Sequence, residues 1–279
     1  MPVRQPAVAG TWYPATPVQL TLTVDRHLAG AGDAPEPPAD LVALIAPHAG
    51  LMYSGPVAAY AYRLLRDHPV DLIVLVGPSH FVAFEGVSIH RAGFATPLGV
   101  AEVDQEVAEA LMAAAPIVHE HPPAHRREHS LEMQLPFIRR LAPGAAIVPL
   151  VMGRQTAETA QALGDAIGTV LGKLVGRRAL VVASTDLSHY HDAATAARLD
   201  AVVIDHVARF DPDGLQRALD AEPGHACGGG PTIAVMRAAR LLGADRATVL
   251  HYADSGDVSG DKSAVVGYLA AAIGRSARR

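Results

Sequence analysis

Three histidines and the single cysteine of the chain stand where metal or acid–base chemistry is expected. His48 and His80 each follow a continuous apolar run, and a third such run leads into STDLSHYH, which carries Asp186 and His189. Cys227 lies in a fourth segment, HACGGGP, directly before three glycines. Ligands of an open α/β sheet bind beyond the carboxyl ends of its strands, so residues that follow separate strands converge. The four segments therefore predict a metal or catalytic site.

We expect His48 and His80 to be metal ligands. Each is bracketed by turn-forming residues, and rigid turns hold an imidazole in the one tautomer that ligation needs. A single loop histidine is more often solvated or a helix cap, but two that follow comparable strands favour ligation. Cys227 is the expected third ligand. Two histidines and a thiolate with an open position suit zinc, copper or iron.

The segment that follows Cys227 predicts a helix. Pro231 suits its first turn, the apolar spacing runs from Ile233 to Leu242, and Gly243 is the expected stop. A thiol placed a few residues before a helix N-terminus is expected to have a lowered pKa, which favours the metal-binding thiolate. The alternative is a buried structural cysteine beside a flexible turn.

Asp186 and His189 form a candidate acid–base pair. An aspartate that orients an imidazole is a recurrent device for proton transfer, and histidine titrates near neutral pH. We therefore predict His189 as proton donor or acceptor and Asp186 as its partner. The spacing is equally compatible with Asp186 capping the next helix and His189 lying in its first turn.

A histidine-rich segment precedes a helix expected over residues 130–141. Ser130 suits the helix cap, and Glu132 in the first turn is either a surface charge favoured by the helix dipole or a pocket carboxylate. The polar, proline-containing loop before this helix gives its histidines no fixed geometry. We predict that these histidines are solvated: His119, His121 and His125.

The late segment 252–268 is either a mobile loop that lines the cleft or a plain surface loop.

The elements that position these residues alternate along the chain. Continuous apolar runs predict strands after residues 40, 71 and 178, and further strands at 145–153, 247–254 and 263–273. Helical spacing occurs at 16–29, 55–67, 104–115, 130–141, 156–175, 193–209 and 232–242. Strands that alternate with helices predict an α/β fold with a mostly parallel central sheet flanked by helices. No linker divides the chain, so we expect one domain over residues 1–279.

Composition narrows the class of protein. With 50% hydrophobic and 18% charged residues, the chain of 279 residues fits a well-packed globular protein. The net charge of −5 and the 5% aromatic share argue against a nucleic-acid partner. No apolar stretch reaches the roughly 20 residues that span a bilayer, and the N-terminus lacks the apolar core of a signal peptide. We expect a cytoplasmic protein without a membrane partner.

Seven segments of the chain resemble the Memo family, named for the mediator of cell motility, whose members include the Memo component of the AmmeMemoRadiSam system. They span almost the whole chain in order: PAVAGTWYP, APHAGLMYSG, GPSH, EHSLEMQLP, STDLSHY, CGGGP and SGDVSGDKSAVVGY. The family is similar in fold to class III extradiol dioxygenases, the non-haem iron enzymes that open catechol rings. The resemblance therefore implies a single α/β domain.

The resemblance also implies roles for individual residues. His48, His80 and Cys227 fall on the metal positions, and His189 falls on the acid–base histidine of the dioxygenases. Five residues fall in the surrounding pocket: Asp186, Trp12, Tyr53, His129 and Glu132.

The third ligand separates this chain from the dioxygenases, which hold iron with two histidines and a carboxylate. The thiolate of Cys227 is softer, so one Fe(II) or copper ion is favoured as cofactor, with zinc as an alternative. We predict a metal-dependent oxidoreductase that acts on an unidentified small molecule or peptide. One alternative is a non-catalytic module that binds a peptide or anion through the glycine amides and the imidazoles. Another is a zinc-dependent hydrolase.

Overall fold

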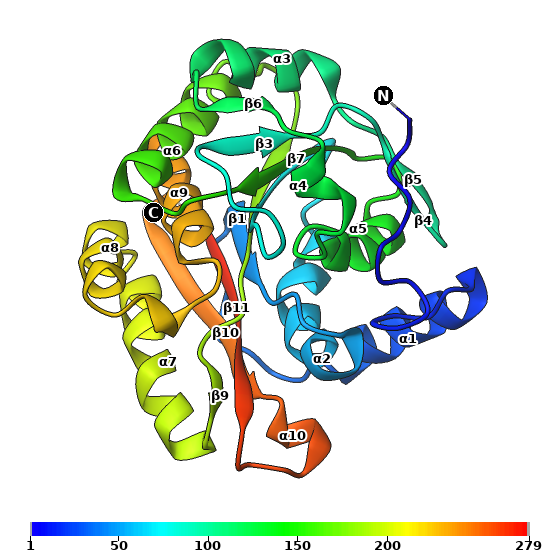
Figure 1. Ribbon diagram of the computed structural model, residues 1–279, viewed down its shortest axis with the longest axis vertical. Coiled ribbons are helices and arrows are strands. Elements are labelled where there is room, and N and C mark those ends of the chain that lie inside the picture. The colour runs from blue at the N-terminus through cyan, green and yellow to red at the C-terminus, as the bar shows by residue number, and fades with distance from the viewer. Residues whose placement is uncertain (1, 278–279) are drawn as a thin grey trace.

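A computed structural model describes residues 2–277 and contains one large mixed sheet with helices on both faces (Figure 1). Eight strands follow one another across this sheet in the order β10-β11-β1-β8-β2-β7-β3-β6, and β9 pairs with β11. Their bounds are β1 (Asp40–Ala46), β2 (Leu72–Pro78), β3 (Val87–Ile89), β6 (Val118–Glu120), β7 (Ala146–Met152), β8 (Ala179–Ser184), β9 (His189–His191), β10 (Arg246–Asp254) and β11 (Val265–Arg275). A separate hairpin pairs β4 (Phe94–Thr96) with β5 (Gly99–Ala101).

The centre of the sheet is parallel. Strand β8 lies between β1 and β2 and runs parallel to both, and β7 continues the parallel order beside β2. Antiparallel pairs flank this centre, where β11 meets β1 and β3 meets β7. The expected α/β fold with a mostly parallel sheet flanked by helices is confirmed.

Both faces of the central strands are apolar, which explains why their sequences are continuous in Val, Leu and Ile. In β2, Val74 and Val76 point to one hydrophobic core, while Ile73 and Leu75 point to the other. The second core packs against α1 (Pro17–Gly30), α2 (Leu51–Tyr62) and α5 (Leu135–Leu141). The first core packs against α3 (Gln105–Ala114), α6 (Ala157–Leu171), α7 (Ala193–Ala208), α8 (Pro212–Ala221) and α9 (Gly229–Leu241).

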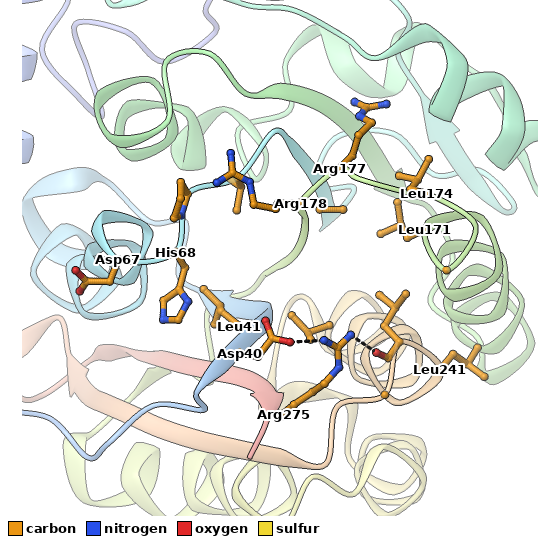
Figure 2. Close-up of a pocket in the computed structure, with 17 residues that line it drawn as sticks. Asp40, Leu41, Asp67, His68, Leu171, Leu174, Arg177, Arg178, Leu241 and Arg275 are labelled. Carbon is orange, nitrogen blue, oxygen red and sulfur yellow. Dashed lines mark hydrogen bonds and ion pairs between the residues drawn. The ribbon is translucent and has the colours of Figure 1, made fainter. Parts of the chain in front are cut away.

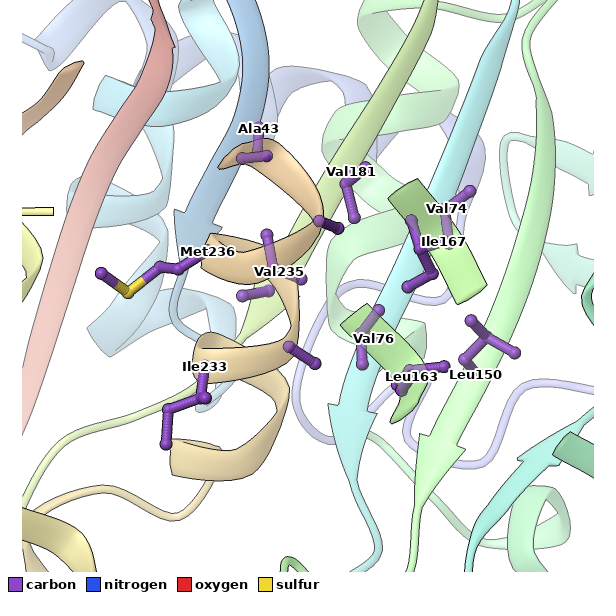
Figure 3. Packing of buried hydrophobic residues seen from close by; sticks show 14 of the residues in the cluster. Ala43, Val74, Val76, Leu150, Leu163, Ile167, Val181, Ile233, Val235 and Met236 are labelled. Atoms are coloured by element: carbon purple, nitrogen blue, oxygen red, sulfur yellow. The ribbon is translucent and has the colours of Figure 1, made fainter. Parts of the chain in front are cut away.

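Helices α6 and α9 pack closely over the first face, where Leu163 and Ile167 of α6 and Val235 of α9 lie above the strands (Figure 3). A Cβ atom at Gly164 would come within 2.8 Å of the Ala234 carbonyl oxygen. Glycine is therefore needed on α6 for the two helices to approach this closely.

Several expected boundaries were wrong. The helix expected from residue 55 begins at Leu51, so Pro56 lies inside it, and residues 63–66 continue as a 3-10 helix. The helix expected from residue 130 begins as a 3-10 turn, Glu132–Gln134, and Ser130 is not its cap, because its hydroxyl donates to the Pro78 carbonyl at 2.9 Å. The helix α8, two single-turn helices, α4 (Pro123–Arg126) and α10 (Gly256–Ser259), and the short strands were not anticipated. No helix between residues 2 and 277 combines the length and apolar character needed to cross a membrane.

Candidate metal centre

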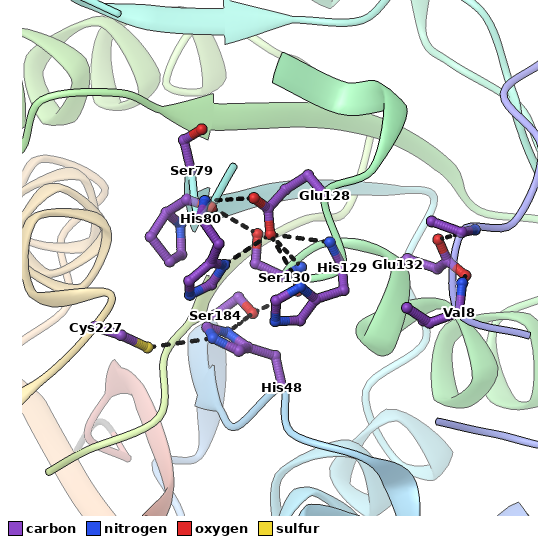
Figure 4. Close-up of polar contacts among 12 residues, drawn as sticks. Val8, His48, Ser79, His80, Glu128, His129, Ser130, Glu132, Ser184 and Cys227 are labelled. Carbon is purple, nitrogen blue, oxygen red and sulfur yellow. Dashed lines mark hydrogen bonds and ion pairs between the residues drawn. The ribbon is translucent and has the colours of Figure 1, made fainter. Parts of the chain in front are cut away.

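The order of the strands explains why distant residues meet. Strands β1, β8 and β2 are neighbours, and their carboxyl ends lie at the same edge of the sheet. His48 follows β1, Ser184 ends β8, and His80 follows β2. A fourth segment, between α4 and the Glu132–Gln134 turn, brings His129 to the same edge (Figure 4).

Three histidines, His48, His80 and His129, form a cluster that can hold one metal ion. One ring nitrogen of each lies within 4.8 Å of the others, a looser spacing than a bound ion would impose. The His80 and His129 rings stack with centroids 4.5 Å apart, and the His48 ring stands edge-on to both, at 5.1 Å and 5.6 Å. The donor set therefore fits a first-row transition metal.

The hydrogen bonds of Ser184 fix the tautomer of His48. The Ser184 hydroxyl donates its only proton to the Ser130 carbonyl at 2.6 Å, so it must accept from Nδ1 of His48 at 2.8 Å. The side-chain amide of Gln134 also donates to this hydroxyl, at 2.8 Å. Nδ1 of His48 therefore carries the proton, and Nε2 is the ring nitrogen that can accept.

Glu128 orients His80 from two sides. Its Oε1 lies 2.8 Å from Nδ1 of His80, and its Oε2 accepts from the backbone N–H of His80 at 2.6 Å. It also accepts from the backbone N–H groups of His129 and Ser130, both at 2.9 Å. Burial alone would raise the pKa of Glu128, but these bonds lower it to about 2. Nδ1 of His80 is thus engaged, and Nε2 is left for a metal.

His129 completes the cluster from a buried position. Burial, and then the neighbouring His48, lower its pKa to about 3. Burial, and then His80, likewise lower the pKa of His48 to about 3. Both rings are therefore neutral at physiological pH, as metal ligation requires. Nδ1 of His129 is buried without a hydrogen-bond partner among residues 2–277, and the Trp12 ring lies 4.4 Å from its ring.

Cys227 lies beside the cluster, with Sγ 3.2 Å from Nε2 of His48 (Figure 4). Burial, and then the nearby Asp186, raise the pKa of this thiol, so the expected lowering by the helix terminus is wrong for the metal-free chain. The side chain of Gln155 holds the glycine loop: it donates to the Cys227 carbonyl at 2.7 Å and accepts from the Gly230 N–H at 2.8 Å. A Cβ atom at Gly228 would lie 2.4 Å from the Ser184 carbonyl oxygen, so this close approach requires glycine.

Asp186 holds the backbone of His48. Its Oδ1 accepts from the backbone N–H of His48 at 2.7 Å, and its own N–H donates to Sγ of Cys227 at 3.3 Å. Burial raises its pKa to about 6. It does not cap the next helix, because Asp192 caps α7 instead. That alternative is therefore wrong.

His189 lies in β9 near the cluster. Burial lowers the pKa of His189, Asp186 acts in the opposite direction, and His80 lowers it further. Nε2 of His189 is buried, and within residues 2–277 it has no hydrogen-bond partner.

The other candidate pocket residues lie in different places. Trp12 is partly exposed beside His129, and Tyr53 is half-buried in the first turn of α2. Glu132 is completely buried and faces the N-terminal segment, where it pairs with Arg4. It also accepts from the Tyr13 hydroxyl at 2.7 Å and from two backbone N–H groups, those of Ala7 and Val8.

The expectation of solvated histidines holds for His119, which is exposed, but not for His125. That side chain is buried, and its Nε2 lies 3.0 Å from the Ser88 hydroxyl.

In the segment 252–268, Lys262 bridges Asp254 and Asp257 at 2.7 Å and 2.6 Å. The segment is therefore internally braced by ion pairs.

Two cavities adjoin the centre, and a third lies elsewhere. A cavity of about 650 Å³ is lined by His80, Phe81 and Arg154, and one of about 250 Å³ is lined by Cys227 and Gln155. The third, about 670 Å³, includes the beginnings of β1 and β8 in its lining (Figure 2). Its arginines, among them Arg275, are each paired with an aspartate.

His129 was predicted only as a pocket residue, and four residues that support the cluster were not predicted: Glu128, Ser184, Gln134 and Gln155. Glu128 and Gln134 both stand in the segment EHSLEMQLP, and Ser184 begins STDLSHY. Membership in these two segments could have indicated Glu128, Gln134 and Ser184, whereas Gln155 lies outside both segments.

Comparison with known proteins agrees with the motifs. The model of the Memo family, described as Memo-like protein, matches residues 4–272. A MEMO1 family protein of Methanosarcina mazei is 40% identical over 271 residues, covering 97% of this chain and 98% of the relative. One of Methanothermobacter thermautotrophicus is 40% identical over 273 residues, covering 95% and 98%.

A solved structure, that of an uncharacterized protein from Escherichia coli K12, shares the fold. It matches with a TM-score of 0.56 at 15% identity, over 82% of this chain and 99% of that chain. The family model and the curated relatives span nearly the whole sequence, and the chain belongs to the Memo family.

Proposed function

We propose that this chain is a metal-dependent oxidoreductase that holds one redox-active first-row ion through His48, His80 and His129. The observation that carries the proposal is the convergence of three imidazoles whose donor atoms lie within 4.8 Å. Hydrogen bonds to Nδ1 of His48 and of His80 leave Nε2 of each ring for the ion. Orienting bonds of this kind are usual around metal-bound histidines.

Cys227 is the proposed fourth donor. Its Sγ lies 3.2 Å from Nε2 of His48, the nitrogen that we propose as a metal ligand. Its raised pKa makes it a thiol in the metal-free chain, so binding of an ion would displace its proton. A thiolate beside imidazoles favours copper, whereas imidazoles alone suit iron and zinc equally.

His189 is the proposed proton donor or acceptor, with Asp186 beside it. A redox-active ion, when bound, would supply electron transfer to or from the substrate. The residues of the chain would then bind the substrate next to His80, in the cavity of about 650 Å³, and move a proton at the His189 ring. The substrate is a small molecule or a peptide segment that enters this cavity.

The donor set favours a second candidate function, a zinc-dependent hydrolase. Three histidines with an open position are a common catalytic zinc site. In that case the ion would lower the pKa of bound water, and His189 or Asp186 would accept the proton.

Metal analysis after anaerobic reconstitution tests the proposal. The wild type, offered Fe(II), Cu(I) and Zn(II) in competition, should retain one equivalent of iron or copper, and His129→Ala and His48→Ala should lose it. His119→Ala is the matched control, because His119 is exposed and lies outside the cluster. Exclusive retention of zinc would favour the hydrolase. Absence of any metal from folded wild-type protein would overturn both and leave a binding module.

A further inference from the structure

A buried carboxylate outside the metal centre lies behind the His189 segment. Asp200 belongs to α7 and is 0% exposed. Its Oδ1 accepts from the backbone N–H of Ser188 at 2.8 Å, and its Oδ2 accepts from the Tyr252 hydroxyl at 2.7 Å. One carboxylate thus joins α7, β10 and the residue that precedes His189.

Strand β11 also holds this segment. Gly267 accepts from the backbone N–H of Leu187 at 2.8 Å and donates to the Ser188 carbonyl at 3.0 Å. A Cβ atom at position 267 would lie 1.9 Å from Oδ2 of Asp200. Glycine at this position is therefore what allows the carboxylate to reach Ser188.

The backbone after His189 is strained. Tyr190 has φ 63°, in the left-handed region that residues with a side chain seldom adopt. Its side chain is 77% exposed, so side-chain burial does not compensate for the conformation. Such strain persists only where the surrounding structure determines the backbone. Pairing of His189 and His191 with β11 and the Asp200 bond to Ser188 supply that constraint.

Among residues 2–277, no hydrogen bond at Nε2 orients the ring of His189. This nitrogen is buried, and Asp186 bonds instead to the backbone of His48. An acid–base imidazole must nevertheless be held in place to transfer a proton efficiently. In this chain the constraint on His189 comes through its backbone.

We propose that Asp200 is a positioning residue that fixes His189 at the metal centre through the Ser188 N–H. This inference rests on the proposed role of His189. Asp200 itself lines neither the cluster nor the adjoining cavities. Its contact with the segment is the hydrogen bond to Ser188, and its charge also acts on the His189 ring.

Amide exchange and histidine-ring NMR of the full, metal-free chain test this role. The double variant Asp200→Val with Tyr252→Phe removes the carboxylate and the hydroxyl together, which leaves only the Ser188 N–H without a partner. We expect faster exchange of the Ser188 amide and a shifted or split His189 ring resonance, with unchanged exchange in β1, β2 and β8. Tyr252→Phe alone is the matched control and should leave both signals as in the wild type.

The conservative variant separates positioning from general stability. Asp200→Asn keeps a carbonyl oxygen for Ser188, so it should keep slow exchange of the Ser188 amide and a single, unsplit His189 ring resonance. An unmoved His189 resonance in the double variant, or faster exchange spread evenly over the sheet, would overturn the inference. If the double variant does not fold, amide exchange of the wild type tests the proposal instead. The Ser188 amide should then exchange as slowly as that of Gly267, and rapid exchange would refute the proposal. None of these measurements requires bound metal, so a failed metal test leaves them interpretable.

Discussion

The two oxygens of the Glu128 carboxylate bind His80 at two points, the ring Nδ1 at 2.8 Å and the backbone N–H at 2.6 Å. This double contact sets both the position of the residue and the rotation of its ring. Because the same carboxylate also binds the N–H groups of His129 and Ser130, one side chain joins two members of the cluster.

Glu128→Gln should weaken metal binding by about 10- to 100-fold, because the amide cannot accept from every donor that the carboxylate holds. Competition with a chelator measures the affinity. Glu109→Gln is the matched control, since Glu109 is exposed and pairs with Arg91 away from the cluster and its cavities. Equal affinity of the Glu128 variant and the control would show that His80 does not depend on this carboxylate.

The stability of the metal-free chain should fall in acid between pH 4.5 and about 2. The hydrogen bonds of Glu128 depress its pKa to about 2 in the folded chain, from 4.5. Its contribution is therefore complete above pH 4.5 and disappears as the pH falls through 2; the shift corresponds to roughly 3 kcal/mol. Urea unfolding across this range should give a flatter curve for Glu128→Gln than for the wild type. Parallel curves would contradict the assignment.

Glu132→Gln should destabilise the fold by about 3 to 5 kcal/mol, because it leaves the buried guanidinium of Arg4 without its negatively charged partner. The measurement is denaturant unfolding followed by circular dichroism. Glu109→Gln breaks the exposed pair with Arg91 and should change stability by about 1 kcal/mol at most. A loss of similar size in both variants would argue against an anchoring role for Glu132.

Metal binding should change the fluorescence of Trp12, the single tryptophan of the chain. Its ring lies 4.4 Å from the His129 ring, so an ion on that imidazole would perturb the excited indole. A fluorescence titration should end at one equivalent, and His129→Ala should abolish the response. A response that survives in this variant would place the ion elsewhere.

Cys227→Ser should weaken metal binding and remove thiolate-to-metal absorption, because a hydroxyl is a poorer ligand near neutral pH. Cys227→Asp should shift the preference from Cu(I) toward Fe(II), since a carboxylate is harder than a thiolate. Metal stoichiometry after anaerobic reconstitution decides. The same occupancy and preference in all three proteins would show that the thiol is a neighbour of the site and not a ligand.

The long central strands and most long helices could be predicted from the sequence, because their apolar runs and periodic spacing are strong local signals. The short strand β9 could not, because three residues carry no period and pair only where β11 lies beside them. The helix α8 was missed although Asp211 caps it and Pro212 opens it. Its start signals were therefore present, but its apolar stripe is short.

The candidate site was predicted only in part, for a physical reason. Strand ends pointed to His48, His80 and His189, whose positions follow from the parallel sheet. His129 and Glu128 follow no strand, so only the tertiary structure brings them to the same edge. The sequence also could not predict that Glu132 binds Arg4 and Tyr13, because both partners lie more than a hundred residues away in sequence.

Because β8 lies between β1 and β2 in the sheet but follows both in sequence, the edge that carries His48 and His80 is completed late in synthesis. His48 and His80 follow strands that do not touch, and the strand that joins them emerges about a hundred residues after His80. A nascent chain on the ribosome therefore displays both histidines long before it can hold them at a common point. The cluster therefore cannot form until β8 has been synthesised and has paired with both β1 and β2.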